Sequence, residues 1–250
     1  MSGNLSLFGM TTALAASAPI PYPSHAQPRP AVTASQFGAP HVFGTIALPL
    51  RTTRFDDRWR RVLRSGALAK HLMPLLRTAR QAPKIEQLRM VNGSLNDRIR
   101  YRYDTGSGDH WSTAGETLSQ SAGDCEDYVI AKLHALKLLG VPERDLFMTI
   151  GHDGVAGAVH AVLVARVKGQ FYILDNRTNQ LIPDNQYRGF YPIITFGTGS
   201  RWLHGYQRGK TPAAVKAISI ALQKKRELPL GNSRGSVVAR AMPTYQVTAL

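Results

Sequence analysis

The sequence contains very little cysteine and few acidic residues. Its 250 residues include one cysteine, Cys125, which excludes an internal disulfide and any zinc or redox site built on a Cys-x-x-Cys pair. No run of about 18 apolar residues follows the N-terminal segment, which excludes a protein with several membrane-spanning helices. Hydrophobic residues make up 43% of the chain and charged residues 19%, so we expect a folded globular core.

The shortage of acidic residues is uneven along the chain. Against 31 Lys and Arg there are 16 Asp and Glu, which gives a net charge of +15. Residues 51–102 carry a net charge of +10 and residues 201–250 one of +8, whereas residues 103–200 carry −4. Basic segments suit a polyanion or an acidic protein, or they form a solvated surface rich in arginine. Because no nucleic-acid-binding motif and no alternation of basic and aromatic residues occurs, we expect no nucleic-acid partner.

Composition divides the chain into four segments. Residues 1–26 carry no charge and contain an apolar run, then prolines and small residues, which predicts a signal peptide cleaved before Gln27 and therefore export. Residues 27–54 are rich in Pro, Ala and Gly and predict an extended linker. The remainder is expected to form one domain over residues 55–205, with a helical N-terminal part at 55–100, and a basic C-terminal extension at 206–250.

The spacing of apolar residues predicts the elements of the N-terminal half. Two helical stretches are expected, Asp56–Arg80 with a break at Pro74, and Ile85–Ile99. Residues 101–122 are polar and rich in Gly, Ser and Thr, which predicts a loop that leads to the cysteine.

The clearest helix begins at the cysteine itself and runs over Cys125–Leu139. Gly140 follows it, where a helix end favours a left-handed residue. Strand-like runs come next, and Lys168-Gly169 predicts a two-residue hairpin turn between the last two of them. These runs are Leu146–Ile150, Val159–Val167 and Phe171–Leu174.

Cys125 is a candidate nucleophile, although a lone cysteine is more often a small buried apolar residue. Its place at a predicted helix N-terminus favours a thiolate, because the helix dipole stabilises negative charge there. The neighbouring acids Asp124, Glu126 and Asp127 act in the opposite direction and raise the pKa of the thiol. A nucleophile in this setting therefore requires a cation that neutralises the carboxylates.

A base and its orienting partner are predicted on the two strands that follow. If Lys168-Gly169 is a two-residue turn, Asp175 lies diagonally opposite His160 on one face of the hairpin, within side-chain reach. A slip of one residue would instead place Asn176 across from His160. Either partner could orient an imidazole. A helix-borne cysteine, a strand-borne histidine and an acid on the next strand together suit nucleophilic catalysis.

These residues stand in a recognisable pattern. It consists of Gly123-Asp124-Cys125-Glu126-Asp127-Tyr128, a helix that ends Leu139-Gly140-Val141-Pro142, Val159-His160-Ala161-Val162-Leu163, and Ile173-Leu174-Asp175-Asn176. The pattern resembles the bacterial transglutaminase-like cysteine proteinases, among them the LapG-type periplasmic proteases, over roughly residues 55–205. The resemblance implies an α+β fold with a papain-like, transglutaminase-type core, in which a helix-borne cysteine packs on an antiparallel sheet that carries the histidine and the aspartate.

The same resemblance implies roles for the site residues. Cys125 would be the nucleophile, His160 the base and Asp175 the orienting acid. The family binds Ca²⁺ through the acids that flank the cysteine, here Asp124 and Glu126. Carboxylate oxygens suit this hard cation. Asp127 and Asp109 are candidates for further ligands.

The resemblance also implies a partner and a location. LapG-type proteins are periplasmic, cut the N-terminal region of large surface adhesins, and are held inactive by an inner-membrane cyclic-di-GMP receptor. Two features depart from the family pattern, the glycine-rich residues 151–158 and the basic extension after residue 207. Both leave the substrate and the receptor open.

The leading hypothesis is therefore a calcium-dependent periplasmic cysteine endopeptidase. A transglutaminase or a cell-wall amidase would use the same three residues and differ only in the acceptor that resolves the acyl-enzyme. A non-catalytic module that docks on a polyanion through its basic segments is a third alternative, against which the intact set of Cys125, His160 and Asp175 argues.

Overall fold

The computed structural model describes residues 38–64, 69–104, 110–213 and 215–216, so the expected signal peptide and most of the basic extension lie outside the described residues. Short 3-10 helices lie at Glu143–Asp145 and Asp184–Gln186. The helices and strands are β1 (Ile46–Pro49), α1 (Asp56–Leu63), α2 (Ala69–Ala79), α3 (Lys84–Arg98), β2 (Arg100–Tyr101), α4 (Ala114–Gln120), β3 (Ala122–Gly123), α5 (Cys125–Leu138), β4 (Leu146–Asp153), β5 (Ala158–Val167), β6 (Gln170–Leu174), β7 (Ile182–Pro183), β8 (Phe190–Gly197) and β9 (Ser200–Gly205).

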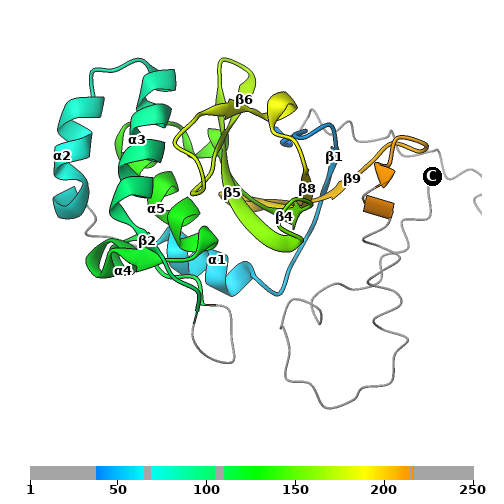
Figure 1. Ribbon diagram of the computed structural model, residues 1–250, viewed down its shortest axis with the longest axis horizontal. Helices are drawn as coiled ribbons and strands as arrows, with labels where there is room; N and C mark the ends of the chain where they lie inside the picture. Colours follow the sequence, from blue (N-terminus) through cyan, green and yellow to red (C-terminus); the bar gives the residue numbers. More distant parts are fainter. Residues whose placement is uncertain (1–37, 65–68, 105–109, 214, 217–250) are drawn as a thin grey trace, which may run out of the picture. The chain divides into compact units, whose positions relative to one another are not determined.

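One antiparallel sheet and a group of helices make up this part of the chain. Seven strands are ordered β1-β9-β8-β4-β5-β6-β7, and β2 and β3 form a separate parallel pair. Figure 1 shows the helices gathered beside the curved sheet. α5 packs against β5 and β4, and on its other sides against α3 and α4. The predicted α+β class is confirmed, with the cysteine on a helix that packs on an antiparallel sheet.

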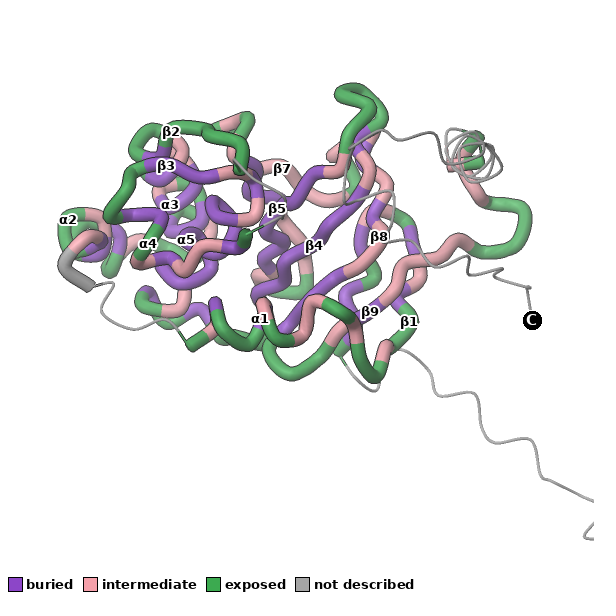
Figure 2. Tube along the Cα trace, turned by 90° about the horizontal axis from the view of Figure 1, so that it is seen from below, coloured by how far each residue is buried: buried purple, intermediate pink, exposed green. Residues whose placement is uncertain are grey.

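α5 is the buried centre of the fold. Every residue from Asp127 to Leu136 is buried, and the tube in Figure 2 is purple along this helix and along β4 and β5. A helix surrounded by other elements must be apolar on most of its faces, and this one is, with Lys132 as a marked exception. Gly140 has a φ of +77°, so the helix ends as predicted.

The β5–β6 hairpin has the predicted turn. Lys168 and Gly169 both have a positive φ, of 49° and 81°, and Val167 pairs with Gln170. Two residues with positive φ match the right-handed twist of the flanking strands. The register continues without a shift to the pair Leu163 and Leu174, so the strand ends that carry His160 and Asp175 have the predicted alignment.

The segment expected to be a loop before the cysteine contains a helix. α4 begins after Thr113, whose side chain accepts a hydrogen bond from the backbone N–H of Glu116. The Glu116 carboxylate in turn accepts from the N–H of Thr113 at 2.6 Å. This capping box stabilises a helix start in a stretch of low helix propensity. The Thr-x-x-Glu spacing is visible in the sequence, so the prediction of a loop over all of 101–122 is wrong.

The linker prediction is wrong for residues 38–54. β1 lies in this range and pairs with β9 at the edge of the sheet. Val42 and Ala47 are completely buried, and the Thr45 hydroxyl lies 2.7 Å from Nδ1 of His204. The folded unit therefore begins before residue 55, because the apolar side chains of this proline- and glycine-rich segment pack at the edge of the sheet.

Pro74 does not break the second helix. α2 continues through Pro74, and the Thr78 hydroxyl donates to the Pro74 carbonyl at 3.1 Å. Only one helical turn precedes the proline, so its ring disturbs only the first turn. α1 ends at Leu63, and residues 65–68 lie outside the described residues. None of the described helices has the length and apolar character needed to cross a membrane.

Loss of the capping box should destabilise the fold measurably. Thr113→Ala removes the acceptor for the Glu116 N–H, and we expect the free energy of unfolding to fall by about 1 kcal/mol. Denaturant unfolding at pH 7 measures this change. Thr113→Ser keeps the hydroxyl and should stay close to the parent protein. Equal stability of Thr113→Ala and the parent would show that the cap contributes nothing.

Candidate active site

The start of α5 is held by a buried carboxylate. Oδ1 of Asp127 accepts a hydrogen bond from the backbone N–H of Ser112 at 2.7 Å, and the carboxylate also accepts from the N–H of Asp124. Burial raises the pKa of Asp127 to about 6. Gly123 leaves the room for this side chain, since a Cβ there would lie 2.5 Å from Oδ2 of Asp127. Asp127 therefore points into the protein and fixes the loop before the helix, and Asp109 lies outside the described residues.

Cys125 is the first residue of α5 and is 8% exposed. Its thiol donates to Oε2 of Glu126 at 2.8 Å, and the sulfur accepts a hydrogen bond from the backbone N–H of Ala161 on β5. The pKa of the thiol is raised well above its usual value, first by burial and then by the charge and hydrogen bond of Glu126, with Asp124 acting in the same direction. The two flanking acids thus oppose the thiolate, as the sequence predicts.

His160 precedes Ala161 on β5 and meets the end of β6. Its Nε2 lies 2.8 Å from Oδ1 of Asp175, and both side chains are buried, with the histidine 7% and the aspartate 3% exposed. The ring also packs edge-on against Phe190, with centroids 6.4 Å apart. The predicted meeting of His160 with Asp175 is therefore present, and it is Asp175 rather than Asn176 that hydrogen-bonds the imidazole.

Asp175 has further hydrogen-bond donors that the sequence analysis missed. The Tyr187 hydroxyl donates to Oδ2 at 2.6 Å, and Arg177 donates to the carboxylate from both its backbone N–H and Nε at 3.1 Å. Burial alone would raise the pKa of Asp175. The hydrogen bond and charge of His160, followed by Tyr187 and Arg177, outweigh burial and hold that pKa well below its usual range. Asp175 is therefore a fixed, ionised acceptor.

The glycine-rich segment that departs from the family pattern supports this cluster. Arg177 forms an ion pair with Asp153 at the end of β4. Asp153 in turn accepts from the backbone N–H groups of Val155 and Ala156, at 2.7 and 2.9 Å. Gly151 pairs with His160, and a Cβ at Gly151 would come within 2.6 Å of the Phe190 ring. Position 151 of β4, which pairs with His160, therefore requires a glycine.

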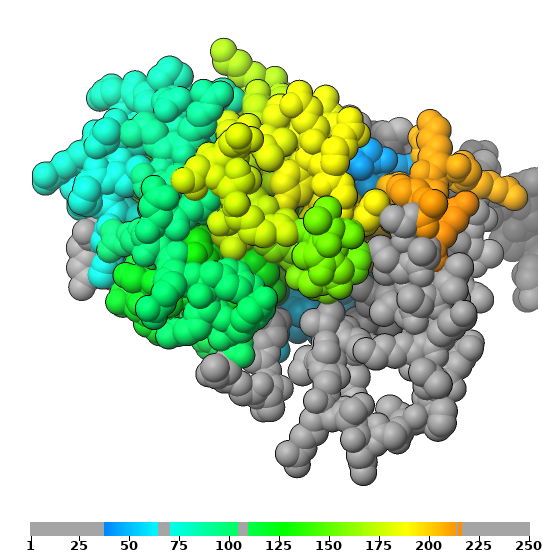
Figure 3. Space-filling view, in the orientation of Figure 1, coloured from blue at the N-terminus to red at the C-terminus, as the bar shows by residue number. Residues whose placement is uncertain are grey.

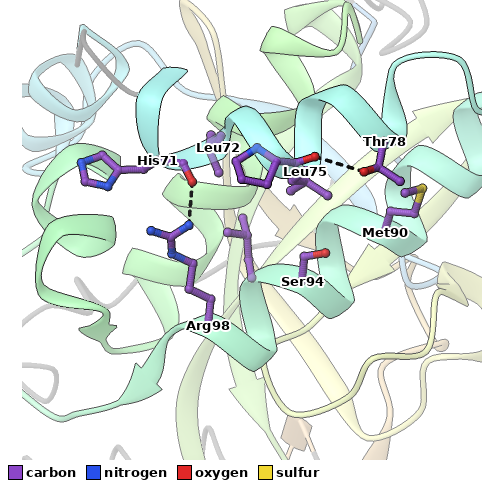
Figure 4. Close-up of a pocket in the computed structure, with 9 residues that line it drawn as sticks. His71, Leu72, Leu75, Thr78, Met90, Ser94 and Arg98 are labelled. Atoms are coloured by element: carbon purple, nitrogen blue, oxygen red, sulfur yellow. Dashed lines mark hydrogen bonds between the residues drawn. The ribbon is translucent and has the colours of Figure 1, made fainter.

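The site is assembled from both halves of the domain. On the face shown in Figure 3, the green residues around 100–125 adjoin the yellow residues around 175–190, and the lime loop between β4 and β5 projects beside them. A cavity of about 330 Å³ lies elsewhere, between α2 and α3. Figure 4 shows its lining, with Arg98 donating to the His71 carbonyl, and the lining includes none of the site residues named above.

Asp124 and Glu126 are the candidate metal ligands. Both residues are partly buried, and they precede and follow Cys125 in the sequence. Within the described ranges, no group of three or more His, Cys, Asp or Glu side chains is arranged to hold a metal ion. The two acids fit a hard cation in their chemistry.

The family comparison covers this site. The family model for the bacterial transglutaminase-like cysteine proteinases matches residues 69–191, a range that contains Cys125, His160 and Asp175. The chain belongs to this family. The predicted resemblance is confirmed, and the α+β arrangement of α5 on the antiparallel sheet is the transglutaminase-type fold of these cysteine proteinases.

Solved structures of related proteins are distant in sequence. Calcium-bound LapG of Legionella pneumophila is 22% identical, the match covers 68% of this chain and 99% of LapG, and the TM-score is 0.49. The EGTA-treated form of LapG is 23% identical, with coverage of 69% and 98% and a TM-score of 0.49. No curated protein matches the chain in sequence.

Removing the Tyr187 hydroxyl should weaken the support of Asp175. We expect Tyr187→Phe to lower the free energy of unfolding by about 1.5–3 kcal/mol at pH 7, because a hydrogen bond to a charged, buried group is lost. Since the folded pKa of Asp175 is depressed, its carboxylate stays ionised at pH 4, so this loss should be nearly the same at pH 4 as at pH 7 and should shrink only as the pH falls through the folded pKa. Tyr172→Phe on β6, whose hydroxyl does not bond Asp175, is the control. Urea unfolding at pH 7 and pH 4 measures both, and a loss that shrinks markedly by pH 4 would contradict a depressed pKa of Asp175.

Proposed function

We propose that this cysteine proteinase is an endopeptidase in which Cys125 is the nucleophile, His160 the base and Asp175 the residue that orients the base. The observation that carries the proposal is the 2.8 Å hydrogen bond between His160 and Asp175. The residue after His160, Ala161, donates its backbone N–H to the Cys125 sulfur. Because Asp175 occupies Nε2 of the ring, Nδ1 is the nitrogen left to take the thiol proton.

The proposed reaction proceeds through an acyl-enzyme. His160 accepts the proton of Cys125, and the thiolate attacks the carbonyl carbon of the peptide bond. The C–N bond breaks, the amine leaves with the proton from His160, and a water molecule then hydrolyses the thioester. The first N–H groups of α5 have no acceptor within the helix, so they can donate to the oxyanion that forms beside Cys125.

Loss of either member of the Cys125–His160 pair should abolish cleavage. Cys125→Ala and His160→Ala should each lower kcat/KM by several orders of magnitude, and the double variant should be no worse, because the two groups act as one unit. Asn176→Ala, next to the orienting acid, is the matched control and should retain activity. Initial rates on a protein substrate measure this. Activity of Cys125→Ala at the parent level would end the proposal.

We further propose that Asp124 and Glu126 hold Ca²⁺. The support is that both carboxylates raise the pKa of the Cys125 thiol, so the reactive thiolate requires a nearby cation. A bound Ca²⁺ would offset their charge. Glu126 would then give up its hydrogen bond to the thiol, which frees the sulfur for His160.

Calcium binding can be measured without catalysis. In the Cys125→Ala background, calorimetric titration should detect Ca²⁺ binding that Asp124→Asn and Glu126→Gln each weaken at least about tenfold, since each removes a charged ligand. Asp145→Asn, a change of the same kind at a distant ion pair with Arg166, is the control. Mg²⁺ should bind poorly because it demands tight octahedral geometry. With an intact Cys125, EGTA should suppress cleavage and Ca²⁺ should restore it. Absence of calcium binding in the parent would refute this site.

We infer that the protein is exported to the periplasm and that its substrate is a protein, with a large surface adhesin as the leading candidate and an inner-membrane cyclic-di-GMP receptor as the candidate regulator. The uncharged segment 1–26 and the family membership support this inference. Incubation with an adhesin fragment, followed by gel and mass analysis, tests it. Two shorter products would support a peptidase, whereas products of higher mass in the presence of an amine would indicate a transglutaminase.

A further inference from the structure

Lys132 lies inside the protein, on the helix that begins at Cys125. It is on α5, seven residues after Cys125, and its side chain is completely buried. Its Nζ has no hydrogen-bond partner among the described residues. Lysine is almost never fully buried unless it is paired. The role of this side chain is therefore not explained by ordinary packing.

An aromatic ring and a carboxylate partly offset the cost of burying the charge of Lys132. Nζ lies 5.6 Å from the centroid of the Tyr128 ring, within range of a cation–π interaction. Residues 125, 128 and 132 share one face of α5 by their spacing of three and four, so the amine lies on the cysteine's side of the helix. Burial lowers the pKa of Lys132 to about 7, and the negative charge of Asp175 opposes this shift.

Asp175 connects Lys132 to the proposed base. The negative charge of Asp175 opposes the effect of burial on the pKa of Lys132, so these two buried groups interact. His160 on β5, Tyr187 and Arg177 all hydrogen-bond Asp175. α3, which also packs against α5, contributes the neutral Asn92 and Asn96 to the segment that follows Asp175. Lys132 and His160 thus act on the same buried carboxylate.

We expect the folded protein to be more stable with an apolar residue at position 132. The buried residues around it on the helix include Val129, Leu133 and Leu136. A buried amine without a hydrogen bond lowers stability, and methionine has a similar length and shape. Residues that break a local rule at a cost in stability concentrate at functional sites. The place of this one, on the helix face of Cys125 and in electrostatic interaction with Asp175, points to the chemistry of the site.

We propose that Lys132 is a positioning residue of the active site, whose buried ammonium offsets the charge of Asp175 and thereby limits how strongly Asp175 holds His160 in its protonated form. The base must both take and return a proton, which requires that its two forms be close in free energy near the working pH. This inference rests on the proposed function, because it assumes that His160 is the base.

The test compares the titration of His160 with and without the lysine. Ring resonances of His160 are followed by NMR against pH in Cys125→Ala and in Cys125→Ala with Lys132→Met, and His160→Gln supplies the assignment. Removal of a neighbouring cation favours the imidazolium, so we expect the midpoint to move up by roughly 0.5–1 pH unit. Lys137→Met, the same substitution farther along α5, should leave the midpoint in place. This readout needs no substrate, so it is independent of whether the protein cleaves one.

Stability and rate provide the second measurement. Lys132→Met should raise the thermal midpoint by roughly 2–4 °C, and in the active enzyme it should move the alkaline limb of kcat/KM to higher pH while lowering kcat. Lys132→Leu, a second apolar replacement, should behave in the same way. A higher thermal midpoint together with an unchanged His160 titration would overturn the proposal, because the lysine would then be a defect of packing. A lower thermal midpoint in both variants would overturn it as well.

Discussion

The hydrogen bond between His160 and Asp175 depends on the geometry of one hairpin. The two-residue turn at Lys168-Gly169 sets the register of β5 and β6, and the side-chain alternation of the strands then brings the two side chains to the same face. The bond itself is 2.8 Å long and buried. Everything else in the site is arranged around it: α5 brings the Cys125 sulfur to the neighbouring backbone N–H, and the segment after β6 surrounds the carboxylate with donors.

The charges of the site fall into two groups with different surroundings. Asp175 is ionised in the interior because His160, Tyr187 and Arg177 donate to it, and Arg177 is itself held by Asp153. Asp124 and Glu126, in contrast, lie beside a thiol that they keep protonated. The first group gives the fold a rigid acceptor beside His160, and the second is the basis of the proposed dependence of Cys125 on a cation. The buried amine of Lys132 adds a third contribution through its interaction with Asp175.

Sequence reasoning could predict the parts of the site that depend on local geometry. A helix start, a two-residue turn and strand alternation were enough to predict that His160 meets Asp175, since only a few residues separate each from the turn. The support of Asp175 could not be predicted in this way. Tyr187 and Arg177 reach it from an irregular segment with no periodic pattern, and Asp153 comes from another strand. β1 was missed because its partner, β9, lies about 150 residues away in the sequence. α4 did carry a readable signal in Thr113 and Glu116, which the polar composition of its surroundings obscured.

The most direct test of the central claim is the reactivity of the single cysteine. Because the chain contains no other thiol, alkylation by iodoacetamide reports on Cys125 alone. With Ca²⁺ present at pH 6, where an ordinary thiol is protonated, the account predicts rapid alkylation of the parent protein and a rate at least tenfold lower in His160→Ala. Mass spectrometry of the intact protein measures both rates. Equal, slow alkylation of the two proteins would contradict a thiolate–imidazolium pair and with it the proposed catalytic role of Cys125.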